Sequence, residues 1–313
     1  MKRVLVITYS QTGQLSSAVE HLTAPLRASA ATEVVVEQLQ PLKPFPYPWS
    51  LFSFLDAFPE CVYLDPAPIA PLSPATAGRF DLVILAWQVW FLSPSQPVAA
   101  FLLSDDARRI LRGQPVISVI ACRNMWLMAF QTVRQLLDAA GARLLDNVAL
   151  TDRGGFATFI TTPWWLLTGK RDALRWLPPA GISDADIRAA RRFGDALVDA
   201  LAVDRERGDA PLLSGLKAVE VDTRLIPSER IGMRSFRIWG KWLRAAGPAG
   251  SLRRRPLLIV YVSFLITLIL TVVPLTMLLR ALLRPLLRRR LEDEKARFEL
   301  PSGSGDAAMA RGA

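Results

Sequence analysis

The chain is poor in the residues that build metal centres and disulfide frameworks. Its 313 residues include two cysteines, Cys61 and Cys122, and a single histidine, His21. Two cysteines are too few for a disulfide framework or a metal cluster, so we predict no metal site. The histidine falls within an expected helix beside an apolar leucine, and we expect it to be structural or solvent-facing.

The N-terminal residues do not have the pattern of a secretory signal peptide. The apolar run at residues 4–7 is too short for a signal peptide, and a polar turn follows it where a cleavage site would stand. The N-terminal part of the chain is therefore expected to stay in the cytoplasm.

Charge is absent from one long segment near the C-terminus. The 24 residues 256–279 contain no Asp, Glu, Lys or Arg. As a helix they would extend about 36 Å, enough to cross a bilayer core of roughly 30 Å. The segment therefore predicts a transmembrane helix, or a membrane-embedded helix that turns back at Pro274.

The basic character of the chain is concentrated on both sides of this apolar run. Residues 1–223 carry 21 Lys and Arg against 22 Asp and Glu, whereas residues 224–255 carry nine against one. Residues 280–297 add seven basic side chains against three acidic ones. Anionic lipid headgroups attract such flanks, so the bilayer is the expected partner and nucleic acid is not. We expect the protein at the cytoplasmic face of the inner membrane, held by its C-terminal anchor.

The first two thirds of the chain alternate strand and helix patterns. Apolar runs predict strands at residues 2–9, 33–39, 81–87, 115–122 and 142–151. Helical periodicity predicts helices at residues 14–29, 95–111, 125–140 and 183–203. This alternation indicates an α/β fold with a doubly wound, five-stranded parallel sheet of the flavodoxin-like order 2-1-3-4-5.

The domain plan follows from these patterns. Residues 1–203 form the flavodoxin-like domain, with an insertion or lid at 40–79. Residues 204–255 are expected to be a basic amphipathic linker, 256–279 the membrane helix, and 280–313 a basic and then disordered tail. Residues 161–177 and 235–246 mix Trp with Lys and Arg, which is typical of membrane-interface segments. For residues 161–177, a packed loop that covers the flavin is the alternative.

The turn after the first strand has the composition of a phosphate-binding loop. Hydroxyl groups and a glycine at a strand-to-helix junction place backbone N–H groups and a helix N-terminus around an anion. The loop lacks a lysine, so a monophosphate such as that of FMN fits it better than a triphosphate; an ordinary turn and helix cap is the alternative. The candidate cofactor-binding residues in it are Ser10, Gln11, Thr12, Gly13, Gln14, Leu15 and Ser16.

This turn resembles the flavodoxin phosphate loop, Ser/Thr-x-Thr-Gly-x-Thr, with Ser10, Thr12 and Gly13 in register. Leu15 stands where the last hydroxyl of that pattern belongs, so Ser16 or Ser17 would have to replace it.

The loops after the third and fourth strands form the other sides of the same crevice. Aromatic side chains there can stack on an isoalloxazine ring, and Arg123 can stabilise a reduced flavin or an enolate. Packing of Trp90 and Phe91 under a lid is the alternative interpretation, and Cys122 is expected to be a buried filler more than a nucleophile. The further candidate cofactor-binding residues are Trp87, Gln88, Val89, Trp90, Phe91, Ser93, Cys122, Arg123, Asn124 and Trp126.

Three stretches carry a more specific resemblance. QVWFLSPSQPVAAFL at 88–102, VISVIACRNMWLMAF at 116–130 and DNVALTDRGG at 146–155 resemble the bacterial dialkylresorcinol condensing enzymes. The resemblance covers roughly residues 1–200. It implies a flavodoxin-like partner of a ketosynthase III-like enzyme, which oxidises a hydrophobic 2,5-dialkylcyclohexane-1,3-dione to a dialkylresorcinol in aryl-lipid biosynthesis.

The catalytic assignment rests on that resemblance. An enolate would lie against Arg123, and Asp152, Arg153 or Tyr9 would transfer protons, with no single base chosen. Two other functions stay open: a flavin reductase of the NAD(P)H:quinone type, and a non-catalytic electron carrier or binding module. The expected cofactors are therefore FMN and, for the first alternative, NAD(P)H.

Overall fold

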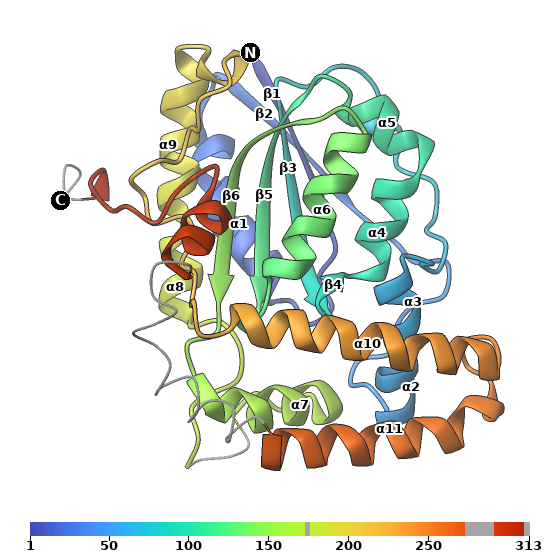
Figure 1. Cartoon of the computed structure of the whole chain (residues 1–313). Coiled ribbons are helices and arrows are strands. Elements are labelled where there is room, and N and C mark those ends of the chain that lie inside the picture. The colour runs from blue at the N-terminus through green and yellow to red at the C-terminus, as the bar shows by residue number, and fades with distance from the viewer. Residues whose placement is uncertain (173–175, 273–290, 310–313) are drawn as a thin grey trace.

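A parallel sheet forms the centre of the protein in a computed structural model that describes residues 1–172, 176–272 and 291–309 (Figure 1). Its strand order is β2-β1-β3-β5-β6, and all four neighbouring pairs are parallel. This is the predicted flavodoxin-type order, with the winding reversed between β1 and β3. The strands are β1 (Lys2–Thr8), β2 (Thr32–Gln38), β3 (Leu82–Trp90), β5 (Pro115–Cys122) and β6 (Arg143–Thr151), and β4 (Ser93–Pro94) pairs antiparallel with β3.

Helices cover both faces of the sheet because its strands are apolar on both sides. In β1, Val4 and Val6 face one core cluster while Leu5 and Ile7 face the other. The first face is covered by α1 (Gln14–Ala28), α8 (Asp184–Ala189) and α9 (Arg191–Ala202). The second is covered by α4 (Gln96–Leu103), α5 (Asp105–Leu111) and α6 (Leu127–Ala139).

Two expected helices are each divided in two. The Ser104 hydroxyl accepts a hydrogen bond from the Ala107 amide and begins α5, which separates it from α4. The helix expected at residues 183–203 is divided at Ala190 into α8 and α9. It begins at its predicted cap, where the Ser183 hydroxyl accepts from the Asp186 amide and donates to the Asp186 carboxylate.

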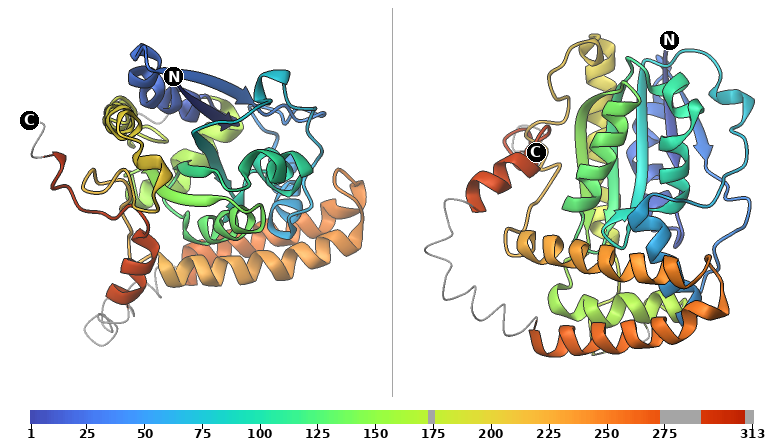
Figure 2. Two further views of the ribbon diagram at one scale, coloured as in Figure 1. Left: turned by 90° about the horizontal axis from the view of Figure 1, so that it is seen from above. Right: turned by 45° about the vertical axis from the view of Figure 1, so that its right-hand side comes forward.

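Three helices lie across the carboxyl ends of the strands (Figures 1 and 2). We call them the helical layer: α7 (Thr158–Thr168), α10 (Ile226–Ala246) and α11 (Arg255–Thr267), which continues as a π-helical turn, η5 (Leu268–Val272). A single 3-10 turn, η4 (Leu252–Arg254), joins α10 to α11.

The insertion packs against this layer. Residues 40–79 contain α2 (Leu51–Asp56), α3 (Phe58–Tyr63) and the 3-10 turn η1 (Pro74–Thr76). Phe58 of α3 stacks with Phe236 of α10 and with Tyr261 of α11, at centroid distances of 5.4 and 4.8 Å. Two segments that show little regular pattern in the sequence therefore form one apolar cluster together.

The expectation that residues 204–255 form a linker is wrong. Leu212 and Leu213 lie in one core cluster of the sheet, and Val221 and Ile226 lie in the other. The segment is part of the folded domain because its apolar residues fill both sides of the sheet.

The expected disorder of the tail is also wrong for its described residues. Residues 291–299 are helical, and the buried Ser302 hydroxyl donates to the Asp146 carboxylate at 2.8 Å. Asp146 is fully buried and accepts two further hydrogen bonds, from the Leu212 and Leu213 amides. A composition rich in Gly and Ser does not reveal such polar anchoring points. Residues 310–313 of the tail lie outside the described residues.

The predicted membrane helix is only partly within the described chain. No helix among the described residues combines the length and apolar character needed to cross a bilayer. Residues 256–272 belong to α11 and η5, and Leu258 and Tyr261 are buried against the domain. Residues 273–290, including Pro274 and the second basic flank, lie outside the described residues.

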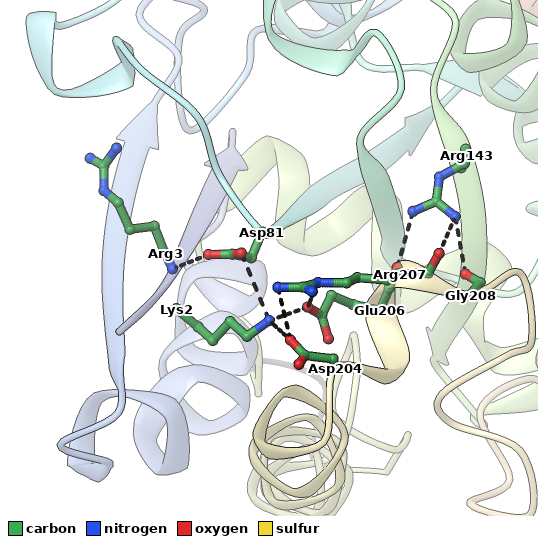
Figure 3. A network of polar contacts seen from close by, with 8 residues as sticks. All are labelled: Lys2, Arg3, Asp81, Arg143, Asp204, Glu206, Arg207 and Gly208. Atoms are coloured by element: carbon green, nitrogen blue, oxygen red, sulfur yellow. Dashed lines mark hydrogen bonds and ion pairs between the residues drawn. The ribbon is translucent and has the colours of Figure 1, made fainter.

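The amino ends of the strands carry a polar network (Figure 3). The Lys2 ammonium group bonds Asp204 and Glu206 and lies 3.8 Å from Asp81. Arg143, at the start of β6, donates to the Glu206 carbonyl at 3.0 Å. These contacts fix the turn η3 (Arg205–Arg207) after α9 against the first and last strands.

Candidate functional site

The start of α1 presents an uncapped helix N-terminus at the carboxyl end of β1. Gly13 occupies the cap position with φ 83°, a left-handed conformation that favours glycine, and no side chain caps the helix. The first amides of a helix have no partner within it, so they are free to bind an anion. The Gly13 amide itself already has a partner in the loop, because it donates a hydrogen bond to the Ser10 hydroxyl oxygen at 3.1 Å. Ser10 and Thr12 are half-exposed, and Gly13 and Ser16 are exposed.

Two glutamines attach this loop to its surroundings. The side-chain oxygen of Gln88 accepts a hydrogen bond from the Gln11 backbone amide at 2.8 Å, which joins the loops after β1 and β3. The Gln14 side chain bonds both the amide and the carbonyl of Ile182 at 3.1 and 3.0 Å. The Gln14 side chain is therefore used for the fold, and only its backbone amide is available to a ligand.

Three of the predicted cofactor-binding residues have buried side chains, and their contact with a cofactor stays a prediction. Leu15 is fully buried under the sheet, so it can offer only its backbone amide. Trp87 is fully buried, and its indole N–H donates to Ser118 at 2.9 Å. Trp126 is 1% exposed and packs against Phe130. Leu15 and Trp87 point into the core because they belong to the apolar faces of α1 and β3, and Trp126, at the cap position before α6, packs into the same core as Trp87.

Trp90 is the centre of an aromatic cluster beside the phosphate loop. Its ring makes edge-to-face contacts with Tyr9, Phe45 and Trp49, at centroid distances of 6.0, 5.0 and 5.5 Å. Phe45 and Trp49 come from the insertion, which is thereby held over the site. Flavin stacking on Trp90 stays a prediction, and it requires the ring to replace at least one of these contacts.

Phe91 serves the hairpin that ends β3. Phe91 and Leu92 both have positive φ, 52° and 60°, a turn geometry that usually selects Asn or Gly. The Phe91 ring packs on Phe54, Phe58 and Phe236. The strained turn is therefore held by aromatic packing against the insertion and α10. Val89 and Ser93 complete the hairpin, in which Val89 pairs with Pro94 and Ser93 pairs with Trp90.

Tyr9 lies at the base of the site and has a perturbed hydroxyl group. It is 8% exposed and donates a hydrogen bond to the Gln11 side chain. Burial raises the pKa of Tyr9 to about 12, so the phenol holds its proton at neutral pH. It can donate a hydrogen bond, but it is a poor general base.

Arg123 and Asn124 bring polar groups to the carboxyl end of β5. The Arg123 guanidinium lies 4.2 Å from the centre of the Phe159 ring of α7 and donates to the Met125 sulfur. Burial lowers the pKa of Arg123, although Cys122, Asp152 and Glu229 nearby oppose that shift. The side-chain amide oxygen of Asn124 is buried and has no hydrogen-bond partner among the described residues. An orphaned acceptor here suits a ligand that carries an N–H group.

The environments of Cys122 and Asp152 are those of residues that support the fold. The Cys122 thiol is free, and burial raises its pKa above the ordinary value, so it is not a ready nucleophile. The Asp152 carboxylate accepts from the Gly154 amide at 2.8 Å and the Gly181 amide at 2.7 Å. Asp152 therefore joins two loops, and proton transfer by it stays a prediction.

Glu229 is a residue of this region that the sequence analysis missed. It lies in the first turn of α10, is fully buried, and accepts from the Met128 amide at the start of α6 at 2.9 Å. Burial raises the pKa of Glu229 to about 8, and amides of α6 and the charge of Arg123 partly offset this effect. Its place beneath the loop after β5 depends on tertiary packing, and the only sequence signal is a single acidic residue in a basic segment.

Two cavities lie at the opposite end of the sheet. One, of about 370 Å³, is lined by Lys2, Asp81 and Arg207 among others, and the other, of about 510 Å³, by a group of arginines before β3 and around α5. Neither touches the predicted site. The site is therefore identified by the helix N-terminus and the convergent loops, and not by an open pocket.

The fold is of the flavodoxin type, which the strand order establishes. No family model and no curated protein matches the chain. The chain is similar to the FMN complex of a flavoprotein from Lactobacillus acidophilus, at 16% identity and TM-score 0.39, over 48% of this chain and 93% of that one. It is also similar to oxidised flavodoxin 1 from Bacillus cereus, at 16% identity and TM-score 0.34, over 63% and 98% of the two chains. A flavodoxin from the domain Archaea matches at 10% identity and TM-score 0.35, over 66% and 99%.

Proposed function

We propose that the protein is an FMN-dependent oxidoreductase that acts on an apolar cyclic dione. The observation that carries the proposal is the uncapped start of α1 at Gly13, next to the winding reversal between β1 and β3. This corner is where doubly wound sheets bind ligands, and its free amides suit a phosphate group.

The residues present fit a flavin mononucleotide. The amides at the start of α1 and the hydroxyls of Ser10 and Thr12 would hold the phosphate. The ring would lie between the Trp90 cluster and the loop after β5, where the orphaned Asn124 oxygen can accept from a ring N–H group. Arg123 would place positive charge beside the ring or beside an enolate oxygen.

The reaction we propose is the one implied by the resemblance to dialkylresorcinol condensing enzymes. A 2,5-dialkylcyclohexane-1,3-dione would become a resorcinol by losing one hydride to a flavin and one proton to a base, for which Asp152 is the carboxylate among the predicted residues, followed by enolisation. Bound FMN supplies the hydride acceptor. Arg123 stabilises the enolate, Tyr9 donates a hydrogen bond, and a ketosynthase III-like partner supplies the dione.

The phosphate assignment can be tested without disturbing the fold. We expect Ser16→Glu to weaken FMN binding by at least about tenfold, because it adds a carboxylate beside the free amides of α1. Ser16 is exposed, and a carboxylate in the first helical turn favours the helix itself. The matched control, Ser16→Gln, has nearly the same size as Ser16→Glu without the charge, and it should weaken FMN binding much less than Ser16→Glu does. Visible absorption during FMN titration measures both.

Riboflavin provides a second control because it lacks the phosphate. Ser16→Glu should leave riboflavin binding unchanged, and wild-type protein should bind FMN more tightly than riboflavin. Equal affinity of wild-type protein for the two flavins, or no uptake of either, would refute the phosphate site. Rapid bleaching of bound flavin by NADPH with a quinone as acceptor would favour the quinone reductase alternative instead.

A further inference from the structure

The helix α11 exposes a continuous apolar face. Its buried side chains, Leu258 and Tyr261, pack on α3 and α10, while the other side of the helix faces outward. Ile259 and Val260 are each 55% exposed, and Ile266 is 52% exposed. No charged residue occurs between positions 256 and 272. An uninterrupted apolar surface of this kind on a folded domain indicates an interaction site.

The neighbouring helix α10 exposes a stripe of two kinds of residue. Ile231, Ile238 and Trp242 lie at i, i+7 and i+11 and are each about half exposed. Exposed basic residues lie beside them on the same side of the helix: Arg234, Arg237 and Lys241. A basic ridge next to an apolar ridge is the pattern of a helix that lies in a membrane interface.

Both helices lie side by side at the carboxyl end of the sheet (Figures 1 and 2). The α7 helix of the same layer adds Ile160 and Trp164, exposed by 48% and 42%. Tryptophan is favoured at the boundary between headgroups and acyl chains because its ring is apolar and its N–H is polar. The exposed apolar residues of the layer thus lie at the end of the molecule that carries the candidate site.

The charge of the helical layer favours a lipid surface over a second copy of the chain as the partner that covers it. Two copies docked through this layer would bring the same basic ridge against itself, and like charges are repelled. An anionic lipid surface complements the ridge and accepts the apolar face of α11 together. The two exposed arginines at the start of α11, Arg253 and Arg255, extend the basic edge.

We propose that the helical layer docks flat on an anionic membrane, with α11 lying in the plane of the headgroup boundary and not across the bilayer. The fully buried Arg254 fixes the start of α11 to the domain through Asp56 and Glu60, at 3.2 and 2.8 Å. Residues 256–267 therefore stay packed on the protein while their outer face contacts lipid. The carboxyl end of the sheet then faces the bilayer, and delivery of an apolar dione from the membrane rests on the proposed function above.

Flotation of the full-length protein with vesicles tests the docking directly. We expect binding to vesicles made of equal parts phosphatidylglycerol and phosphatidylcholine, weaker binding to phosphatidylcholine alone, and release from the anionic vesicles at high salt. The double variant Ile259→Glu, Ile266→Glu should lower the bound fraction by at least about tenfold, because it places two charges on the apolar face. Both positions are more than half exposed, so the fold should tolerate them.

A matched control uses an exposed apolar residue at the other end of the molecule. Val203, at the end of α9, is 68% exposed, and Val203→Glu should float with vesicles like the wild type. Undiminished flotation of the double variant, or wild-type protein that resists alkaline carbonate extraction, would overturn the flat docking and indicate a spanning segment. FMN titration of the same proteins separates the two proposals, because the double variant should keep wild-type flavin affinity whether or not it binds vesicles.

Discussion

The two ends of the parallel sheet are built from different chemistry. At the amino end, charged groups meet one another in an ion-pair network beside two cavities (Figure 3). At the carboxyl end, aromatic rings and three helices cover the strands, and a few charged groups, such as Glu229 and the ion-paired Arg254, are buried beneath them. The uncapped N-terminus of α1 lies at the other end of the sheet from both cavities, so an open cavity alone is a poor guide to the candidate site in this fold.

The largest effect on stability is expected at the carboxyl end, for Arg254→Leu. The Arg254 side chain is 2% exposed, and its guanidinium bonds Asp56, Glu60 and the Gly247 carbonyl. Its removal leaves two poorly hydrated carboxylates without their cation, which costs about 3–5 kcal/mol in the free energy of unfolding. Urea unfolding followed by circular dichroism measures the change.

The neighbouring arginine is the control for this variant. Arg253 is exposed, and Arg253→Leu should change the free energy of unfolding by less than about 0.5 kcal/mol. If the two variants are equally stable, the α10–α11 connection is not fixed by the buried ion pair. The flat position of α11 would then lose its main structural support.

A smaller effect is expected at the amino end, for Lys2→Met. Glu206 is 2% exposed at its side chain and bonds the Lys2 ammonium group, while Arg207 lies 3.9 Å away. The variant leaves Glu206 with this one distant cation, but the adjoining cavity lets water reach the network. We therefore expect a loss of about 1–3 kcal/mol, less than for Arg254→Leu.

An exposed ion pair serves as the comparison for Lys2. Lys217 lies 3.6 Å from Glu220, and both side chains are about half exposed. Lys217→Met should cost less than about 0.5 kcal/mol in the same unfolding experiment. A loss at Lys2 as large as that at Arg254 would show that the two ends bury their charges equally.

The central sheet was predictable, whereas the layer over its carboxyl end was not. Continuous apolar runs such as that at β5 indicate a strand without reference to the rest of the chain. The insertion and the helical layer stabilise each other through Phe58, Phe236 and Tyr261, which are far apart in sequence. An apolar run such as 256–272 shows that a surface is to be covered, but not whether lipid, protein or both will cover it.

The site was predictable to the level of its loops but not of every side chain. Gly13 was identified because a glycine at a strand-to-helix turn has a local physical cause. The burial of Trp87 and Trp126 was not predictable, because a residue at the end of a strand or before a helix points inward or outward according to the register. Glu229 was missed because its partners at the start of α6 are about a hundred residues away in sequence.

Glu229, buried where the strands of the sheet end, makes the stability of the protein depend on pH. Glu229 has a pKa of about 8 in the folded protein against 4.5 for the ordinary group. The folded protein therefore keeps this proton over a range in which the unfolded chain has lost it, and stability falls as pH rises from 4.5 to about 8. Glu229 contributes at most about 1.4 kcal/mol per pH unit to this fall. Glu229→Gln should remove the contribution, because a neutral amide has nothing to ionise.

Urea unfolding over this pH range compares the wild type with Glu229→Gln and with a surface variant, Glu20→Gln. Glu20 is exposed on α1, so Glu20→Gln should keep the wild-type slope of unfolding free energy against pH. Glu229→Gln should be more stable relative to wild type at the alkaline end than at the acidic end, because the buried negative charge is then absent. A parallel pH profile for all three proteins would mean that Glu229 is ionised in the fold and paired with Arg123. The carboxyl end would then bury a second compensated charge, in addition to Arg254 with Asp56 and Glu60.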